Sequence, residues 1–166
     1  MKNLKLLVSV TLLSVSIIIA CGESSTDGSS TNEDGIVTSR IINEGNIYTI
    51  DDFQVAGLKK PKSIKADAVD KKTGEAITPN AKEIHVGFFK SSMGPKDIEL
   101  RIYSSHQDAL DYGVSPAEKT ISAAVEAGGA VKGAGTFAKS SYGAYVVTGN
   151  AIMLCQVQIE VCDELS

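Results

Sequence analysis

The chain has 166 residues, of which 43% are hydrophobic, and its 16 basic and 20 acidic side chains give a net charge of −4. This balance does not suggest a nucleic-acid-binding protein, because neutralising phosphates requires a basic surface. After Ile19 no apolar run is long enough to cross a membrane as a helix.

The first 20 residues have the pattern of an export signal. Lys2 and Lys5 lie in a short basic start, and residues 6–19 carry no charge. This run is shorter than the roughly 20 residues that a membrane-spanning helix needs. A basic start, a short apolar stretch and a small residue before a cleavage site are typical of a signal peptide. We therefore expect residues 1–20 to be removed.

The residues before Cys21 resemble the lipobox of bacterial lipoproteins. Ile18, Ile19 and Ala20 precede the cysteine, so an aliphatic residue opens the motif and a small one closes it. The family usually has Ala, Ser or Gly at the position of Ile19. The resemblance implies cleavage after Ala20, a diacylglycerol on the Cys21 thiol, and a domain held on the extracytoplasmic side of a cell membrane or outer membrane. An uncleaved anchor and a plain secretory signal are the alternatives.

Residues 21–35 are predicted to be the lipidated cysteine and a disordered tether. Residues 22–35 contain no apolar side chain, so they cannot bury enough surface to offset the entropy of ordering. A flexible chain of this length typically reaches about 20 Å. The segment matches part of a calcium-binding loop, but Ser30 and Ile41 stand where two of the ligands belong. It is therefore interpreted as a linker.

Residues 36–166 are predicted to form a single domain. Loss of Lys2 and Lys5 leaves 14 of the 16 basic side chains against 20 acids, a net charge near −6. Cys155 and Cys162 are too far apart to pair within one strand or one helix, so a disulfide requires a bend between them. Export permits this disulfide, which we predict, with two buried free thiols as the alternative.

The first elements in chain order are a helix and a hairpin turn. Thr49 and Gly57 are suitable caps for a helix over residues 50–56, which has acids in its first turn. The lysine-rich segment 59–65 is interpreted as a solvated surface, with contact to anionic lipid as the alternative. A hairpin turn is predicted at 71–75.

Four strands are predicted from the apolar pattern. Residues 83–89 and 97–103 alternate between apolar and polar side chains. Residues 142–148 and 151–157 are apolar on both faces, which favours central strands, and Gly149 with Asn150 suits a tight turn between them.

Two helices are predicted between these strand pairs. Ser104 or Ser105 caps the first, which ends at Gly113, and Ser115 begins a capping box for the second. Residues 159–165 fit either a strand or a helix. Hairpins with helices gathered in one stretch predict an α+β fold. We expect a mainly antiparallel sheet of about five strands, with two or three short helices packed on one face.

No enzyme or cofactor site is predicted. Residues 133–140 approach nucleotide-binding loops, but a helix precedes and a strand follows them, so no helix N-terminus meets a phosphate. No serine or cysteine has the base and orienting group of a nucleophilic site. His85 and His106 lie on separate segments, so a metal site is not expected.

One binding surface is predicted on the two alternating strands. His85, Arg101 and Tyr103 lie opposite the apolar residues of their strands, so they can form a shared patch if the strands are neighbours. We expect a membrane-anchored, non-enzymatic module for interaction or envelope maintenance, with an unknown protein or small-ligand partner. A small-ligand carrier and a hydrolase dependent on His106 are the alternatives.

Overall fold

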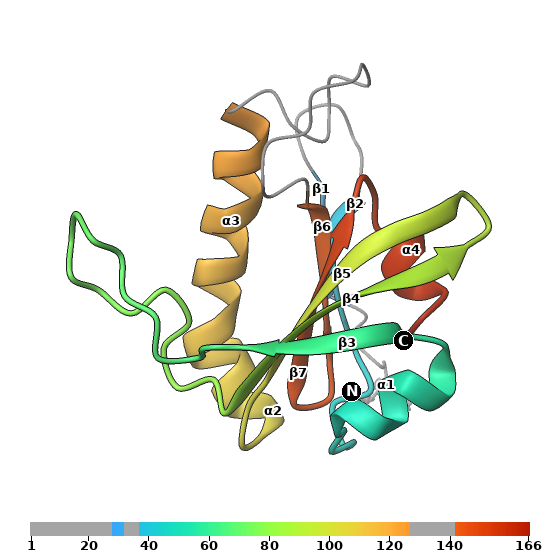
Figure 1. The fold of residues 1–166 in the computed structure, drawn as a ribbon, viewed down its shortest axis with the longest axis horizontal. Helices are drawn as coiled ribbons and strands as arrows, with labels where there is room; N and C mark the ends of the chain where they lie inside the picture. Colours follow the sequence, from blue (N-terminus) through green and yellow to red (C-terminus); the bar gives the residue numbers. More distant parts are fainter. Residues whose placement is uncertain (1–27, 32–36, 127–141) are drawn as a thin grey trace, which may run out of the picture.

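The computed structural model of the chain describes residues 28–31, 37–126 and 142–166 (Figure 1). They form a seven-stranded sheet with helices on both faces. The strands are β1 (Gly28–Thr31), β2 (Val37–Ile42), β3 (Lys59–Ile64), β4 (Glu83–Ser91), β5 (Gly94–Ile102), β6 (Tyr142–Thr148) and β7 (Ala151–Gln156). The helical segments are α1 (Ile50–Ala56), α2 (His106–Asp108), the π-helical turn η1 (Ala109–Gly113), α3 (Val114–Glu126) and α4 (Glu160–Asp163).

The strand order across the sheet is β1-β2-β6-β7-β5-β4-β3. Five of the neighbouring pairs are antiparallel, and β2 pairs with β6 in parallel. The α+β class is therefore confirmed, but the sheet is mixed and wider than the expected five or so strands. The additional strands β1, β2 and β3 flank the four predicted ones, and backbone pairing forms them from sequences without a clear apolar alternation.

Both edge strands differ from their sequence interpretation. β1 falls within the expected disordered tether, yet its backbone pairs with β2 from Gly28 to Thr31. β3 coincides with most of the lysine-rich segment and contains Pro61. Proline lacks an N–H and is tolerated on an edge strand, and lysines there oppose pairing with another sheet. Lysines and a proline are therefore compatible with either a solvated surface segment or an edge strand, and in the structure β3 is an edge strand.

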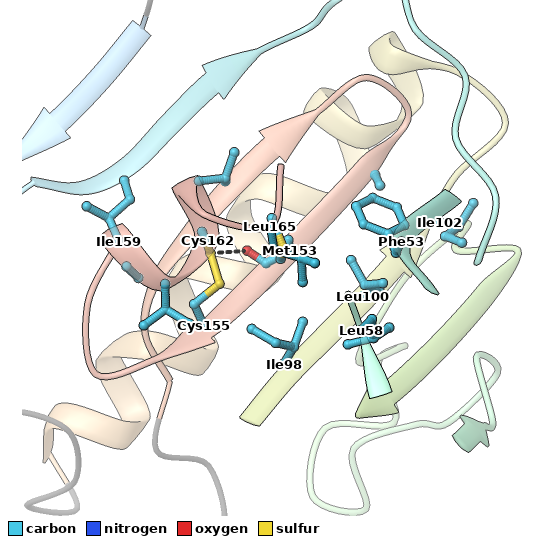
Figure 2. Packing of buried hydrophobic residues seen from close by; sticks show 14 residues of the cluster. Phe53, Leu58, Ile98, Leu100, Ile102, Met153, Cys155, Ile159, Cys162 and Leu165 are labelled. Atoms are coloured by element: carbon cyan, nitrogen blue, oxygen red, sulfur yellow. Dashed lines mark hydrogen bonds between the residues drawn. A yellow bond between two sulfur atoms is a disulfide. The ribbon is translucent and has the colours of Figure 1, made fainter. Parts of the chain in front are cut away.

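The sheet has a buried core on each face. On one face, Phe53 and Leu58 from the α1 region, together with α4, cover the apolar side chains of β5 and β7 (Figure 2). On the other face, α3 and η1 cover Tyr145, Val147 and Ile152 of β6 and β7. The expectation of helices on one face is therefore wrong. Apolarity on both faces of β6 and β7 indicated two covered faces, which a single helical layer does not supply.

The first predicted helix is confirmed with its bounds. The Asp52 carboxylate accepts hydrogen bonds from the backbone N–H and the hydroxyl of Thr49, both at 2.8 Å. These bonds anchor the first turn and hold the pKa of Asp52 below its ordinary value. Gly57 ends the helix with a φ of +128°. Local capping therefore determined this element.

The two helices predicted around Gly113 are one continuous helical segment from His106 to Glu126. The Ser105 hydroxyl caps it by accepting from the Asp108 N–H at 3.1 Å. The chain passes from η1 into α3 instead of stopping at Gly113. Pro116 lacks an N–H and crowds the preceding turn, and the π-helical turn lies just before it. Gly113 and the capping box at Ser115 predicted a helix end and a new helix start, and in the structure they mark this irregular turn.

The two strong strand predictions form the hairpin of β4 and β5, which extends to Ser91 and Gly94. The turn at 71–75 is confirmed, with Gly74 at a φ of +73° and its N–H bonded to the Asp70 carbonyl at 2.8 Å. Its flanks form only the isolated bridge between Val69 and Ala76. The residues on either side of the turn therefore do not form a paired two-stranded ladder. No helix in the described parts of the chain meets the length and apolarity needed to cross a membrane.

Candidate functional site

The predicted surface of His85, Arg101 and Tyr103 does not form. β4 and β5 are neighbours, but their register places His85 opposite Leu100 and Ile84 opposite Arg101. Directly opposed residues project from the same face of an antiparallel pair. His85 therefore lies on the opposite face from Arg101, which is buried together with Tyr103. The prediction assumed that the two strands have one buried face and one exposed face in common. In the structure, side chains are buried on both faces of the sheet.

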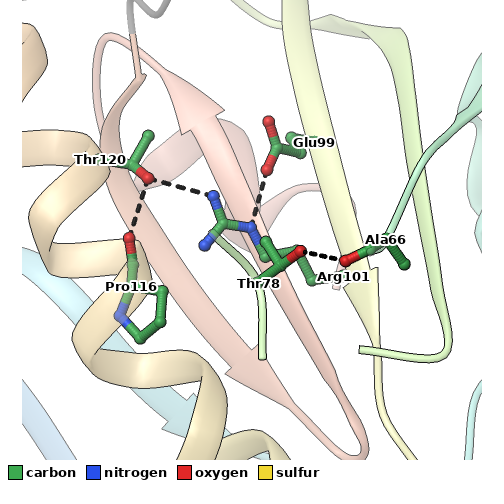
Figure 3. A network of polar contacts seen from close by, with 6 residues as sticks. All are labelled: Ala66, Thr78, Glu99, Arg101, Pro116 and Thr120. Atoms are coloured by element: carbon green, nitrogen blue, oxygen red, sulfur yellow. Dashed lines mark hydrogen bonds and ion pairs between the residues drawn. The ribbon is translucent and has the colours of Figure 1, made fainter. Parts of the chain in front are cut away.

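A buried polar network lies between β5 and α3 (Figure 3). The Arg101 Nε donates to the Glu99 Oε1 at 2.7 Å, and Nη2 donates to the Thr120 hydroxyl at 3.1 Å. The Thr120 hydroxyl donates in turn to the Pro116 carbonyl at 2.8 Å. Arg101 is only 2% exposed and the Glu99 side chain 14%. The network therefore links an ion pair on the sheet to the first turns of α3.

This network has two polar atoms without hydrogen-bond partners among the described residues. They are the Nη1 of Arg101 and the hydroxyl of Tyr103. A buried polar atom left unpaired costs about 1–3 kcal/mol, so such atoms occur where packing or binding requires them. The Tyr103 hydroxyl packs against Gly113, where an added Cβ would lie only 2.7 Å from it. Close packing at η1 therefore accounts for the position of this tyrosine.

Two tyrosines of β6 extend the polar seam beneath α3. Burial, together with the charge of Glu99, raises the pKa of Tyr142 far above its ordinary value. Burial likewise raises the pKa of Tyr145, whose hydroxyl donates to Glu118 Oε1 at 3.2 Å. Both phenols are therefore protonated at neutral pH and serve as hydrogen-bond donors. The bond from Tyr145 to Glu118 attaches α3 to the sheet.

A surface cleft separates α3 from the turn at 71–75. It has a volume of about 440 Å³ and reaches Pro116 and Thr120, the helical residues of the buried network. A neighbouring hollow of about 420 Å³ lies along the same segment and shares Ala76 with it. The side chains at the larger cleft are mixed in charge and polarity, and include Asp70, Thr73, Glu75, Ile77 and Lys119. The cleft is open to solvent, with both polar and apolar side chains at its walls.

The two histidines have structural partners. His106 Nδ1 lies 2.7 Å from the Gly149 carbonyl in the turn between β6 and β7, and His85 Nε2 lies 2.9 Å from the Glu83 carboxylate. The same turn is held by Asn150, which bonds the backbone of Tyr48 and Tyr103. His106 therefore helps to fix a turn, and its position at a helix start agrees with the sequence interpretation.

The predicted disulfide is confirmed. Cys155 and Cys162 are bonded, with their α-carbons 5.6 Å apart. The chain turns between them at Val157, which has a φ of +77°, and then enters α4. The bond lies in the core and fastens α4 to β7 (Figure 2). The bend that the spacing required is thus supplied by the start of the C-terminal helix.

Several predicted motifs lie outside the described residues. These are the signal at 1–20, the lipid acceptor Cys21, the glycine-rich segment at 133–140 and residues 32–36 of the calcium-like segment. Within the described ranges, no group of three or more His, Cys, Asp and Glu side chains is placed to hold a metal ion.

The buried network was missed, although the sequence contains a signal for it. Glu99 and Arg101 carry opposite charges at alternate positions of one strand and therefore share a face. An alanine-rich helix follows in the sequence, and small side chains allow a helix to approach a sheet closely. That combination indicates a covered ion pair, whereas polar character alone suggested an exposed face.

Comparison with known proteins adds one likeness. No match was found among curated proteins or among solved structures. Residues 49–130 match a family of unknown function, DUF6810. This span runs from the cap of α1 through β3, β4 and β5 into α3, and it contains the whole buried network but not β6 or β7. The chain is therefore similar over this region to proteins of the DUF6810 family.

Proposed function

We propose that this protein is a lipoprotein anchored through Cys21, with a non-catalytic α+β domain that serves interaction or envelope maintenance on the extracytoplasmic side. The observation that carries the proposal is the lipobox-like sequence ending in Ala20 and Cys21. The disulfide of Cys155 and Cys162 supports the same location, because disulfides persist in oxidising compartments and are rare in the cytosol.

The geometry of the domain supports a binding role over catalysis. The imidazoles of His85 and His106 are engaged with a carboxylate and a backbone carbonyl, and the buried tyrosines are protonated donors. General base catalysis requires a base within reach of a nucleophile and a suitable pKa. The surface cleft is also open to solvent, whereas a small-ligand carrier is expected to enclose its ligand.

The direct test is incorporation of labelled palmitate into the full chain in a lipoprotein-processing bacterial host. We expect labelling of the wild type and none of Cys21→Ala. The double variant Cys155→Ala/Cys162→Ala is the matched control, since it loses two thiols but keeps the acceptor, and it should label like the wild type. Mass spectrometry should place the mature N-terminus at residue 21.

Equal labelling of wild type and Cys21→Ala, or a mature N-terminus elsewhere, would refute the anchor. The non-catalytic part is tested separately by hydrolase assays on the purified protein. A hydrolytic activity that disappears in His106→Ala, while the fold is retained by circular dichroism, would refute it. The two results are independent, because lipidation does not require a particular function of the domain.

A further inference from the structure

An unpaired group of lysines lies on the edge of the sheet. Four exposed lysines, which we call the β3 lysines, lie within residues 59–65, after α1: Lys59, Lys60, Lys62 and Lys65. No acidic residue occurs between Gly57 and Ala66. Among the described residues, the ion pairs involve other side chains, so these four ammonium groups are left to solvent. A chain with a net negative charge thus has one locally basic strand.

The edge position exposes this charge on one side of the sheet. β3 pairs only with β4, and its outer edge is open. The register shifts between Lys59 and Lys62, and Lys60 has a φ of +49° within this bulge. Lys59 pairs with Phe88 and Lys62 pairs with Val86, so these two lysines share one face of the sheet. A bulge also twists an edge strand away from strand addition, so a protein strand is a poor occupant of this edge.

Two exposed apolar side chains lie close to the lysines in the sequence. Val55 in the last turn of α1 is 91% exposed, and Ile64 at the end of β3 is 41% exposed. Apolar side chains among basic ones are the composition with which a protein contacts the headgroup region of a bilayer. A patch of this kind combines attraction to anionic lipid with shallow insertion of a few apolar groups.

The β3 lysines lie on the opposite edge of the sheet from β1, the first described strand after the proposed anchor. Gly28, the first residue of β1, pairs with Ile41, and the neighbouring Ile42 carbonyl accepts from the Gly149 N–H in the turn between β6 and β7. α1 lies at the same end of the molecule as that turn, and β3 runs from α1 across the molecule (Figure 1). Residues 22–27 separate Gly28 from Cys21, and even fully extended they span only about 24 Å.

We propose that the β3 lysines, with Ile64, form a contact surface for an anionic lipid bilayer. The inference rests on the proposed function to decide which side of the membrane the domain faces. The attraction of lysines to anionic lipid does not depend on that function. Glu23 and Asp27 in the tether oppose the attraction, and the four lysines outnumber them. Each lysine near an anionic surface strengthens binding about fivefold. One acyl anchor and a basic patch together hold a domain in a defined orientation.

The test uses the mature chain from residue 21 with Cys21→Ala, which retains every described element and carries no lipid. In vesicle sedimentation at millimolar lipid, it should bind vesicles containing 30% phosphatidylglycerol but not pure phosphatidylcholine. Binding should disappear in 0.5 M salt, which screens charge over about 4 Å. The triple variant Lys59→Gln/Lys60→Gln/Lys62→Gln should bind on the order of 100-fold more weakly.

The matched control is Lys71→Gln/Lys72→Gln/Lys119→Gln, which removes the same charge from the 71–75 turn and α3. It should retain binding, and equal loss in both triple variants would refute a specific patch. Loss of edge protection can make the β3 variant aggregate, so Lys65→Glu, just beyond the paired strand, provides a second test. Binding that is unchanged in Lys65→Glu, or absent from anionic vesicles altogether, overturns the proposal. If the palmitate test fails and the vesicle test succeeds, the lipid anchor is refuted but the contact with anionic lipid is retained.

Discussion

Removal of the Glu99 carboxylate charge is the sharpest test of the buried network. In Glu99→Gln, the Arg101 guanidinium keeps its place at 2% exposure but loses its counter-charge. Removing one partner of a buried ion pair costs about 3–5 kcal/mol. The Glu99 side chain is 14% exposed, so some water reaches the pair and the lower end of this range applies. We expect a loss of about 3 kcal/mol in the free energy of unfolding.

The opposite substitution should cost less. Arg101→Met removes the fully buried cation and leaves a carboxylate that is nearer to solvent. We expect a loss of about 1–2 kcal/mol, which includes the hydrogen bond to Thr120. The double variant should be more stable than Glu99→Gln alone, because it no longer buries an unpaired charge. The sign of this coupling distinguishes an unpaired charge from a simple loss of packing.

Urea unfolding followed by circular dichroism measures these differences. With a slope of about 2 kcal/mol per molar urea, a loss of 3 kcal/mol lowers the midpoint by about 1.5 M. Glu83→Gln on the neighbouring strand is the control, since Glu83 is 56% exposed and should change stability by less than about 0.5 kcal/mol. A loss below 1 kcal/mol in Glu99→Gln, or additive losses in the double variant, would refute the reasoning.

Three further predictions concern the disulfide, the π-helical turn and the contact between Ser92, just after β4, and Glu164, just after α4. Cys162→Ala should lower the free energy of unfolding by about 2.5 kcal/mol, measured by thermal unfolding, because the closed loop is short. Gly113→Ala should cost about 1–3 kcal/mol in urea unfolding, because the new methyl group meets the Tyr103 hydroxyl, even though alanine favours helices. Hydrogen bonds from the side chain and backbone of Ser92 lower the pKa of Glu164. The stability that Ser92→Ala loses should therefore be present above pH 4.5 and diminish as the pH falls through the lowered pKa.

Each of these predictions has its own control. Strong reductant should leave the Cys162→Ala variant unchanged, while it destabilises the wild type towards the same midpoint. Gly45→Ala adds a methyl group with no neighbour within 4 Å, and a cost equal to that of Gly113→Ala would contradict the packing argument. A loss in Ser92→Ala that grows as the pH falls would contradict the sign of the pKa shift at Glu164.

The sequence was most informative where the deciding interactions are local. The cap at Thr49 and Asp52 and the stop at Gly57 are separated by a few residues, and the predicted helix has the observed bounds. The turn at Gly74 and the bend needed between Cys155 and Cys162 were likewise set by short-range geometry. In these places the chain has few alternatives, since dihedral limits and nearby hydrogen bonds leave one arrangement.

The candidate site depended on contacts that the sequence pattern does not encode. Alternation identified which residues of β4 and β5 share a face, but not that both faces are covered, so Arg101 was expected at the surface. Gly113 was interpreted as a helix stop, although its role is close packing against Tyr103 and Ile152. Similarly, polar β1 became a strand only because β2 offers it a backbone ladder.

By itself, the sequence determined the capped helix, the hairpin turns and the α+β class, because each arises from propensity and spacing within short segments. The tertiary structure alone decided the parallel position of β2, the second helical layer and the burial of the charge pair. Such features depend on which distant segments exclude water from a given side chain, and the free energy of burial is a property of the assembled neighbours.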